Sequence, residues 1–374
     1  MTTHKQRIAS IDVARGLVML LMTVDHVRET FFLQHQVSDP MDVGATDPAL
    51  FFTRLSAHFC APMFVFLTGL SAWLYAHPPG GPRDATGFLV KRGLLLIGLE
   101  IVAVNFAWTG TFMPATLYLQ VIWAIGLAML ALALLHRLPL PLIGVLGLAI
   151  VAGHNALHPA FDPGTIAHGL WTVLEQRGFL LDAPVRVKIS YPVLAWIGVI
   201  LLGYAAGPLY ARATSPTLRR RTLVTLGAAG LALLAVLRTA NGYGEPLPWT
   251  GYGDTLRTAM SFLNFTKYPP SLDFVLLTLG VGFIVLAWVE RPMRWTPLAA
   301  VFGGAPLFYY LLHLYALLAL QKLAAFAAGV PRADVQHVWQ VWAIAALLAV
   351  ALYWPTRWFG NYKRSSGKGW VKYF

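Results

Sequence analysis

A histidine and several charged residues recur at helical spacing near the start of the chain. Read as a helix, the segment from Arg7 to Phe32 places six side chains on one stripe: Asp12, Arg15, Met19, Met22, His26 and Glu29. A charged side chain near the centre of a bilayer costs at least about 2.5 kcal/mol, so such a stripe indicates a functional site. We predict that His26 is the working residue, because an imidazole gains or loses a proton near neutral pH.

The same segment contains two aspartate and arginine pairs with identical spacing. Asp12 and Arg15 lie one helical turn apart, and we expect an ion pair near the cytoplasmic interface, either as a structural pin or as part of the catalytic group. Asp25 and Arg28 repeat this spacing near the outer end, where a solvated pair is the simpler interpretation. Arg28 is also a candidate for substrate binding.

Two later segments add candidate residues: the first should come near His26, and the second suits a groove that grips a flat or amphipathic ligand. Arg54 and His58 lie four residues apart on one helical face, and a short outer loop joins their segment to the first one. Tyr310 and His313 lie one turn apart after a glycine pair and a proline, in FGGAPLFYYLLHLY. For His58 and Tyr310, packing inside a helical bundle is the alternative to a role in the site.

Other patterns carry less chemical information. Lys91 and Arg92 lie at a cytoplasmic helix end, where membrane insertion explains them and phosphate binding is the alternative. His154 and His158 have the spacing of a metal-binding pair, but no third ligand with suitable spacing follows, so we expect no metal. Phosphate-binding loops and dinucleotide fingerprints are absent from the sequence.

The composition defines the elements that must hold these residues. Of 374 residues, 57% are hydrophobic and 12% are charged, and the mean hydropathy is +0.62. These values predict an integral membrane protein. The net charge of +12 follows from the basic residues that membrane insertion collects in the cytoplasm, so it does not indicate nucleic-acid binding.

We predict an all-α polytopic transmembrane bundle that forms a single domain over residues 1–374. About ten spans are expected, at 10–33, 49–76, 86–109, 114–136, 139–157, 190–211, 218–239, 271–289, 297–327 and 335–359. Alternate loops carry 17 basic residues on one side and 8 on the other, which places both termini in the cytoplasm. The long loops near 158–189 and 240–270 are then external, and the first should contain a short amphipathic helix.

Several segments resemble one enzyme family. RIASIDVARGLVMLLMTVDH, FFTRLSAHFCAPMFVFLTG, KYPPSLDF, YPVLAWIGVILLGYAAG and FGGAPLFYYLLHLY are similar to the bacterial branch of the heparan-alpha-glucosaminide N-acetyltransferase family. The D-x-x-R-G pattern at Asp12, followed by His26, is also similar to the broader membrane acyltransferases that decorate bacterial polysaccharides. His313 falls in the late helix where the animal members of the family place a histidine.

The resemblance implies a membrane-bound acyltransferase in a bacterial inner membrane. Such an enzyme takes acetyl from cytosolic acetyl-CoA, its co-substrate, and delivers it to an amine or hydroxyl of a sugar or glycan at the outer side. Its partners are then the lipid bilayer, a CoA thioester and the glycan, with no nucleic acid, and a homodimer remains open. In the animal enzymes the working histidine aligns with the first external loop, which here contains His35.

We therefore expect His26 to act as a general base, or to carry the acetyl group itself. Arg54, His58 or Tyr310 would stabilise the oxyanion, and Lys91 or Arg92 would hold the CoA phosphates. The main alternative is a transporter or exporter of an anionic solute, which would use the same histidines and arginines as a relay and as counter-charges. An assembly protein without chemistry is the third alternative.

Overall fold

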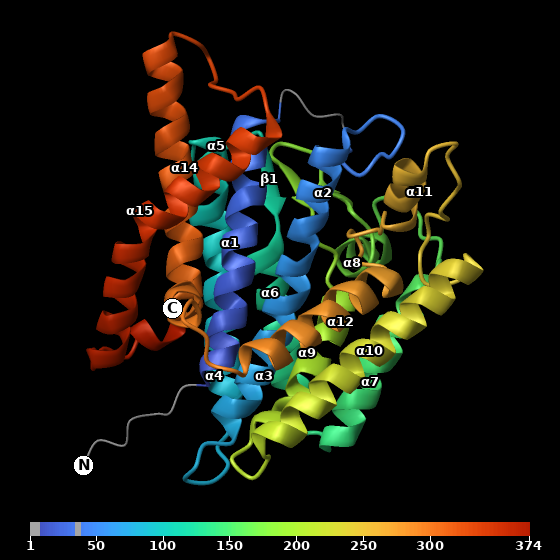
Figure 1. The fold of residues 1–374 in the computed structure, drawn as a ribbon, viewed down its shortest axis with the longest axis vertical. Coiled ribbons are helices and arrows are strands. Elements are labelled where there is room, and N and C mark those ends of the chain that lie inside the picture. The colour runs from blue at the N-terminus through green and yellow to red at the C-terminus, as the bar shows by residue number, and fades with distance from the viewer. Residues whose placement is uncertain (1–7, 34–38) are drawn as a thin grey trace.

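Helix α1 lies between α3 and α14 in the computed structural model, which describes residues 8–33 and 39–374 (Figure 1). The helices are α1 (Ala9–Phe31), α2 (Pro48–Ser56), α3 (Cys60–Ala76), α4 (Thr86–Leu99), α5 (Asn105–Thr109), α6 (Val121–Leu135), α7 (Leu140–Gly153), α8 (Ile166–Leu174), α9 (Leu194–Ala205), α10 (Pro216–Ala240), α11 (Thr255–Phe262), α12 (Leu272–Val289), α13 (Thr296–Gly304), α14 (Pro306–Ala328) and α15 (Val338–Ser365). A π-helical turn, Glu100–Val104, joins α4 to α5.

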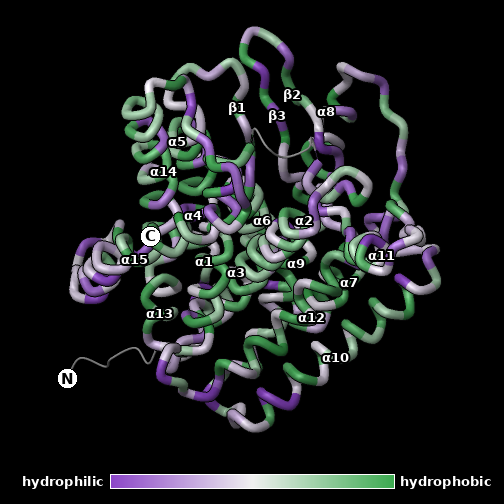
Figure 2. Tube along the Cα trace, turned by 45° about the horizontal axis from the view of Figure 1, so that its top comes forward, coloured by the Kyte–Doolittle hydropathy of each residue, from purple (hydrophilic) through white to green (hydrophobic). Residues whose placement is uncertain are grey.

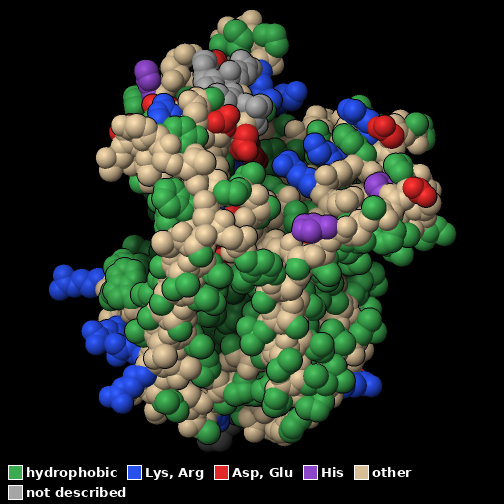
Figure 3. Space-filling view, turned by 90° about the vertical axis from the view of Figure 1, so that its right-hand side faces the viewer, with side chains coloured by type: hydrophobic (Ala, Val, Ile, Leu, Met, Phe, Trp, Pro, Cys, Tyr) green, Lys and Arg blue, Asp and Glu red, His purple; other side chains and the backbone are tan. Residues whose placement is uncertain are grey.

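Within the described residues, five helical segments are long and apolar enough to cross a bilayer: Pro48–Ala76, α10, α12, α14 and α15. Figure 2 shows the hydrophobic residues concentrated in the helices, with hydrophilic residues in the loops beside the strands. Hydrophobic side chains cover the middle of the face in Figure 3, and charged side chains gather above them. These features are those of an integral membrane protein. Ten spans and cytoplasmic termini stay predictions.

Local capping explains where several of these helices begin. Asp47, Ser215 and Ser271 each accept a hydrogen bond from a backbone N–H in the first turn of the helix that follows. The second predicted segment is interrupted by a 3₁₀ turn at Ala57–Phe59. Pro62 therefore falls in the first turn of α3, a position that tolerates proline, rather than kinking a continuous helix.

Two glycines allow α1 and α13 to touch along their backbones. A Cβ atom on Gly16 would lie 1.8 Å from the carbonyl oxygen of Ala299, and one on Gly303 would lie 1.8 Å from that of Asp12. No larger residue fits either position without separating the helices. The glycines that follow the arginine in the first motif and that precede Pro306 therefore bring α1 beside the start of α14.

The prediction of an all-helical chain missed a small sheet. Strands β1 (Thr116–Leu119), β2 (Gly178–Leu181) and β3 (Arg186–Ile189) pair in the order β1-β3-β2. β1 runs parallel to β3, whereas β2 runs antiparallel to it. Strands of four residues whose partner is distant in sequence leave no periodic pattern to read. The amphipathic helix expected in the first long loop is present as α8.

Candidate active site

His26 and His313 form a hydrogen bond between α1 and α14. The His26 Nδ1 atom lies 2.7 Å from the His313 Nε2 atom, and the two rings are nearly parallel, at 6°. The His313 Nδ1 atom lies 2.9 Å from the backbone oxygen of Tyr309. His26 is half-buried and its ring also contacts the rings of Trp108 and Tyr310.

This arrangement determines where the protons lie on two neutral rings. A carbonyl oxygen only accepts hydrogen bonds, so Nδ1 of His313 must carry the proton and donate it to Tyr309. The Nε2 atom of His313 is then an acceptor, and it receives the Nδ1 proton of His26. What remains on His26 is an Nε2 atom with a lone pair, which is the form that a general base or a nucleophile requires.

A pocket with about 860 Å³ of empty space, including its opening to solvent, reaches Met22 and Tyr310, each one helical turn before a histidine of this pair. Arg15, Arg92 and Lys363 supply its cationic lining, and Met22 and Tyr310 are among its apolar and aromatic lining. Such a pocket suits a ligand with negative charge at one end and an apolar arm at the other.

Cationic and apolar residues follow one another in chain order along three helices that line the pocket. The lining residues proceed from Arg15 to Met22 in α1, from Arg92 to Leu96 in α4 and from Pro306 to Tyr310 in α14. His26 lies one turn beyond Met22, and His313 lies one turn beyond Tyr310. Both histidines therefore stand past the apolar end of the pocket, with Tyr310 between His26 and the pocket.

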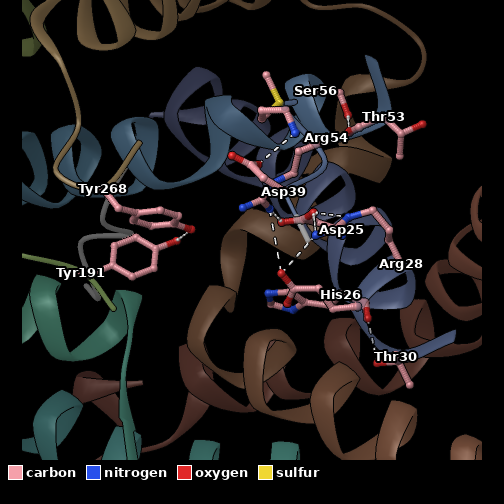
Figure 4. Close-up of polar contacts among 12 residues, drawn as sticks. Asp25, His26, Arg28, Thr30, Asp39, Thr53, Arg54, Ser56, Tyr191 and Tyr268 are labelled. Carbon is pink, nitrogen blue, oxygen red and sulfur yellow. Dashed lines mark hydrogen bonds and ion pairs between the residues drawn. The ribbon is translucent and has the colours of Figure 1, made fainter. Parts of the chain in front are cut away.

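A charged cluster surrounds Asp25 on the opposite side of His26 (Figure 4). Arg28 donates to the Asp25 Oδ1 atom from Nε at 3.0 Å and from Nη2 at 2.9 Å, and Arg54 donates to the Oδ2 atom at 2.5 Å. Glu29 also pairs with Arg28, at 3.1 Å. The prediction that Asp25 and Arg28 form a solvated pair is therefore wrong, because both residues are buried.

Of the other predicted site residues, some line the pocket and others lie away from it. Arg15 pairs with Asp12 at 3.8 Å, lines the pocket, and donates to the Leu67 carbonyl at 3.0 Å and to Ser71. Arg92 lines the pocket too, whereas Lys91 beside it is exposed.

His58 is fully buried and its ring lies 5.2 Å from that of Phe274. Its Nδ1 atom has no hydrogen-bond partner among the described residues. The structure thus brings Arg54 to the charged cluster but does not bring His58 into contact with His26. His35 lies outside the described residues.

Several residues near the site were not predicted from the sequence. Ser71 and Lys363 line the pocket, Trp108 contacts His26, and Lys267 is buried in the loop before α12. Tyr268 donates a hydrogen bond to Tyr191 at 3.2 Å, and Figure 4 shows this pair beside the charged cluster. Lys267 and Tyr268 were visible in KYPPSLDF, where a lysine directly precedes an aromatic residue and two prolines.

The bundle and its site define a helical membrane protein with a hydrogen-bonded histidine pair between a cation-lined pocket and a charged cluster. Residues 7–234 match the family described as heparan-alpha-glucosaminide N-acetyltransferase, catalytic, and the chain belongs to that family. None of the curated proteins matches this sequence. The family match includes His26, Arg54 and His58, whereas Lys267 and His313 lie beyond it.

Proposed function

We propose that this protein transfers an acetyl group from cytosolic acetyl-CoA to an amine or hydroxyl of a sugar or glycan acceptor at the outer side. The observation that carries the proposal is the hydrogen-bonded chain from His26 through His313 to Tyr309. In the neutral His26 ring this chain places the proton on Nδ1 and leaves Nε2 unprotonated, between the pocket and the charged cluster. Family membership supports the class of reaction.

In this proposal the pocket binds the donor from the cytoplasmic side. Arg15, Arg92 and Lys363 hold the phosphates of CoA, and the apolar lining receives its extended arm. Asp12 pairs with Arg15 and orients the guanidinium toward the pocket. Because Tyr310 stands between the pocket and His26, its ring shifts when the thioester approaches the histidine.

The acceptor approaches from the side of the charged cluster. The Nε2 atom of His26 takes a proton from the acceptor as its nitrogen or oxygen attacks the thioester carbon. An acetyl-histidine intermediate would use the same lone pair, so both routes need the tautomer that His313 holds. Arg28 and Arg54 fix Asp25 beside the histidine, and Glu29 offers a carboxylate at the same face.

The test is acetyl transfer by purified protein in lipid nanodiscs, measured with labelled acetyl-CoA and a panel of amino sugars. Wild-type protein should release CoA thiol and label an acceptor. His26→Ala should lower turnover by about 10²- to 10⁴-fold, the usual loss of a general base. His313→Ala should lower turnover by roughly 100-fold without weakening donor binding, because His26 then loses its fixed tautomer.

The exposed loop residue His158 provides the control, and His158→Ala should keep full turnover. His26→Ala with wild-type turnover would refute the assignment of the base. Uptake of an anionic solute by proteoliposomes without release of CoA would instead support the transporter.

A further inference from the structure

Glu29 is a charged side chain of the cluster that stays accessible. The residue lies one turn after His26 on α1, and its side chain is 36% exposed, whereas those of Asp25 and Arg28 are 10% and 2% exposed. His26 is half-buried as well. Residues three positions apart on a helix lie side by side. His26 and Glu29 are therefore neighbours on the accessible part of this helix end, while Asp25 and Arg28 are buried.

The two arginines of the cluster make their closer contacts with Asp25. Arg28 donates to the Asp25 Oδ1 atom from two nitrogen atoms, at 3.0 and 2.9 Å, and Arg54 donates to the Oδ2 atom at 2.5 Å. The Oε1 atom of Glu29 lies 3.1 Å from Arg28 and 3.9 Å from Arg54. An ion pair with an exposed partner adds little to stability. Pairing with the arginines therefore does not account for Glu29.

The second carboxylate oxygen of Glu29 is open to a ligand. Both ionic contacts use Oε1, and Oε2 has no hydrogen-bond or ionic partner among residues 8–33 and 39–374. The nearby Arg332 donates to the backbone oxygens of Glu29 and Thr30, at 3.0 and 2.9 Å. An ionised carboxylate only accepts hydrogen bonds, and an ammonium group only donates them. The open oxygen thus suits a cationic nitrogen beside His26.

An amine acceptor needs an anion at this place, whereas a hydroxyl acceptor does not. A protonated amine that approaches the cluster meets the guanidinium groups of Arg28 and Arg54, so a carboxylate must offset the repulsion. The amine must also lose a proton before its nitrogen can attack a carbonyl carbon. A carboxylate one helical turn from the base meets both needs, because it holds the ammonium where His26 can deprotonate it.

We propose that Glu29 binds the ammonium group of an amino-sugar acceptor and presents it to His26, an inference that rests on the proposed function. The Nε2 atom of His26 takes one ammonium proton, which frees the nitrogen lone pair. Attack then forms the carbon–nitrogen bond and breaks the carbon–sulfur bond. Sulfur leaves as CoA thiol with the proton from His26, and the second ammonium proton passes to water. Glu29 stays ionised throughout and selects an amine over a hydroxyl.

The experiment compares Glu29→Gln, Glu29→Asp and Asp162→Asn in nanodiscs, because Asp162 is an exposed carboxylate in another loop. The acceptors are methyl glucosaminide and methyl glucoside, which has a hydroxyl in place of the amine. The measurements are kcat, KM for each substrate, binding of desulfo-CoA and the apparent Tm. A glutamine side chain keeps the shape of Glu29 and an oxygen for Arg28, but it removes the negative charge.

Glu29→Gln should raise the KM for methyl glucosaminide by about tenfold or more, the effect of losing a hydrogen bond between two charged groups. Its desulfo-CoA binding and Tm should stay at the wild-type level. Glu29→Asp, which keeps the charge on a shorter side chain, should have a KM between those of wild type and Glu29→Gln. Asp162→Asn should match wild type in every measurement.

Wild-type KM for methyl glucosaminide in Glu29→Gln would overturn the assignment and leave the proposed function intact. A wild-type enzyme that acetylates methyl glucoside but not methyl glucosaminide would do the same. Parallel losses of acceptor KM, desulfo-CoA binding and Tm would show that Glu29 is structural and would also overturn it. Wild-type protein without acetyl transfer to any acceptor would refute the proposed function and this inference together.

A measurement on the wild-type protein applies if Glu29→Gln does not fold. A carbodiimide couples methyl glucosaminide to accessible carboxylates, and peptide mass spectrometry locates the product. Coupling at Glu29 should saturate as the amine concentration rises, because the amine binds there first, whereas coupling at Asp162 should rise in proportion to concentration. Coupling at Glu29 that never saturates would overturn the proposal.

Discussion

Near each end of helix α1 an aspartate is followed three residues later by an arginine, but the two ion pairs differ in length and in burial. Asp12 and Arg15 form a 3.8 Å pair in which the arginine side chain is 17% exposed and lines the pocket. Asp25 and Arg28 form a 2.9 Å pair in which the arginine side chain is 2% exposed. The spacing is identical, so the surroundings decide whether the cation faces the pocket or is buried in the fold.

A second cation at the C-terminal end of α1 explains the difference. Arg54 reaches Asp25 from α2, so one carboxylate neutralises two buried guanidinium groups. At the N-terminal end of α1, Arg15 is held by neutral partners, the Leu67 carbonyl and Ser71, in addition to Asp12. We infer that the Asp25–Arg28 pair contributes mainly to stability and that the Asp12–Arg15 pair contributes mainly to binding.

The largest effect should come from Asp25→Asn. Removing this carboxylate leaves two buried guanidinium groups without their main counter-charge, which should cost about 3–5 kcal/mol. The apparent Tm in nanodiscs should fall accordingly. Asp12→Asn is the matched control and should cost about 1 kcal/mol, because Arg15 keeps its other hydrogen bonds. Equal losses in the two variants would remove the distinction between the ends.

Arg15→Met tests the binding side of the comparison. It should weaken desulfo-CoA binding about tenfold, or about 1.4 kcal/mol, while the apparent Tm changes little. Arg28→Met should show the reverse, with a lower Tm and unchanged affinity in the protein that remains folded. Calorimetric titration and thermal unfolding of both variants measure the two quantities. An affinity loss in Arg28→Met alone would reverse the assignment of the two ends.

The smallest effect should come from a third pair, in which Asp84, in the exposed loop before α4, lies 3.0 Å from Arg137, in the turn after α6. Hydrogen bonds from Thr86, helped by Arg137, lower the pKa of Asp84 from 3.8 to about 2. The stabilisation from this carboxylate is present above about pH 4 and is lost as the pH falls through 2. Asp84→Asn should therefore flatten the Tm profile between pH 4 and pH 2 and leave acetyl transfer at pH 7 unchanged.

Much of the α1 face could be predicted from the sequence, because the face on which a residue lies depends only on residue spacing within one helix. A period of three to four residues placed Arg15, Met19 and Met22 on one stripe, and all three line the pocket. The same reasoning failed for Asp25 and Arg28, because burial depended on Arg54, a partner in another helix. Helical spacing predicts which residues share a face but does not predict what covers that face.

Lys267 shows a different limit. The sequence analysis counted Lys267 only among the basic residues that set the predicted membrane orientation, and this count carries no information on whether a side chain is buried. Its burial depends on Glu245, which lies 22 residues earlier and closes the loop through Thr266 and Ser271. His313 was already a candidate site residue in the sequence. Its direct hydrogen bond to His26 could not be predicted, because that bond depends on the packing of α14 on α1.

The contacts between α1 and α14 have a mechanical consequence. Gly303 touches Asp12 just before α14 begins, Tyr309 bonds Thr23 at 2.8 Å, and Gln321 bonds the Thr30 carbonyl at 2.9 Å. These contacts along both helices hold the two imidazoles in one frame. The pocket is completed by residues of other helices, among them Ser71 of α3, Arg92 of α4 and Ile122 of α6, so a donor of different bulk has to be accommodated at those walls rather than between the histidines.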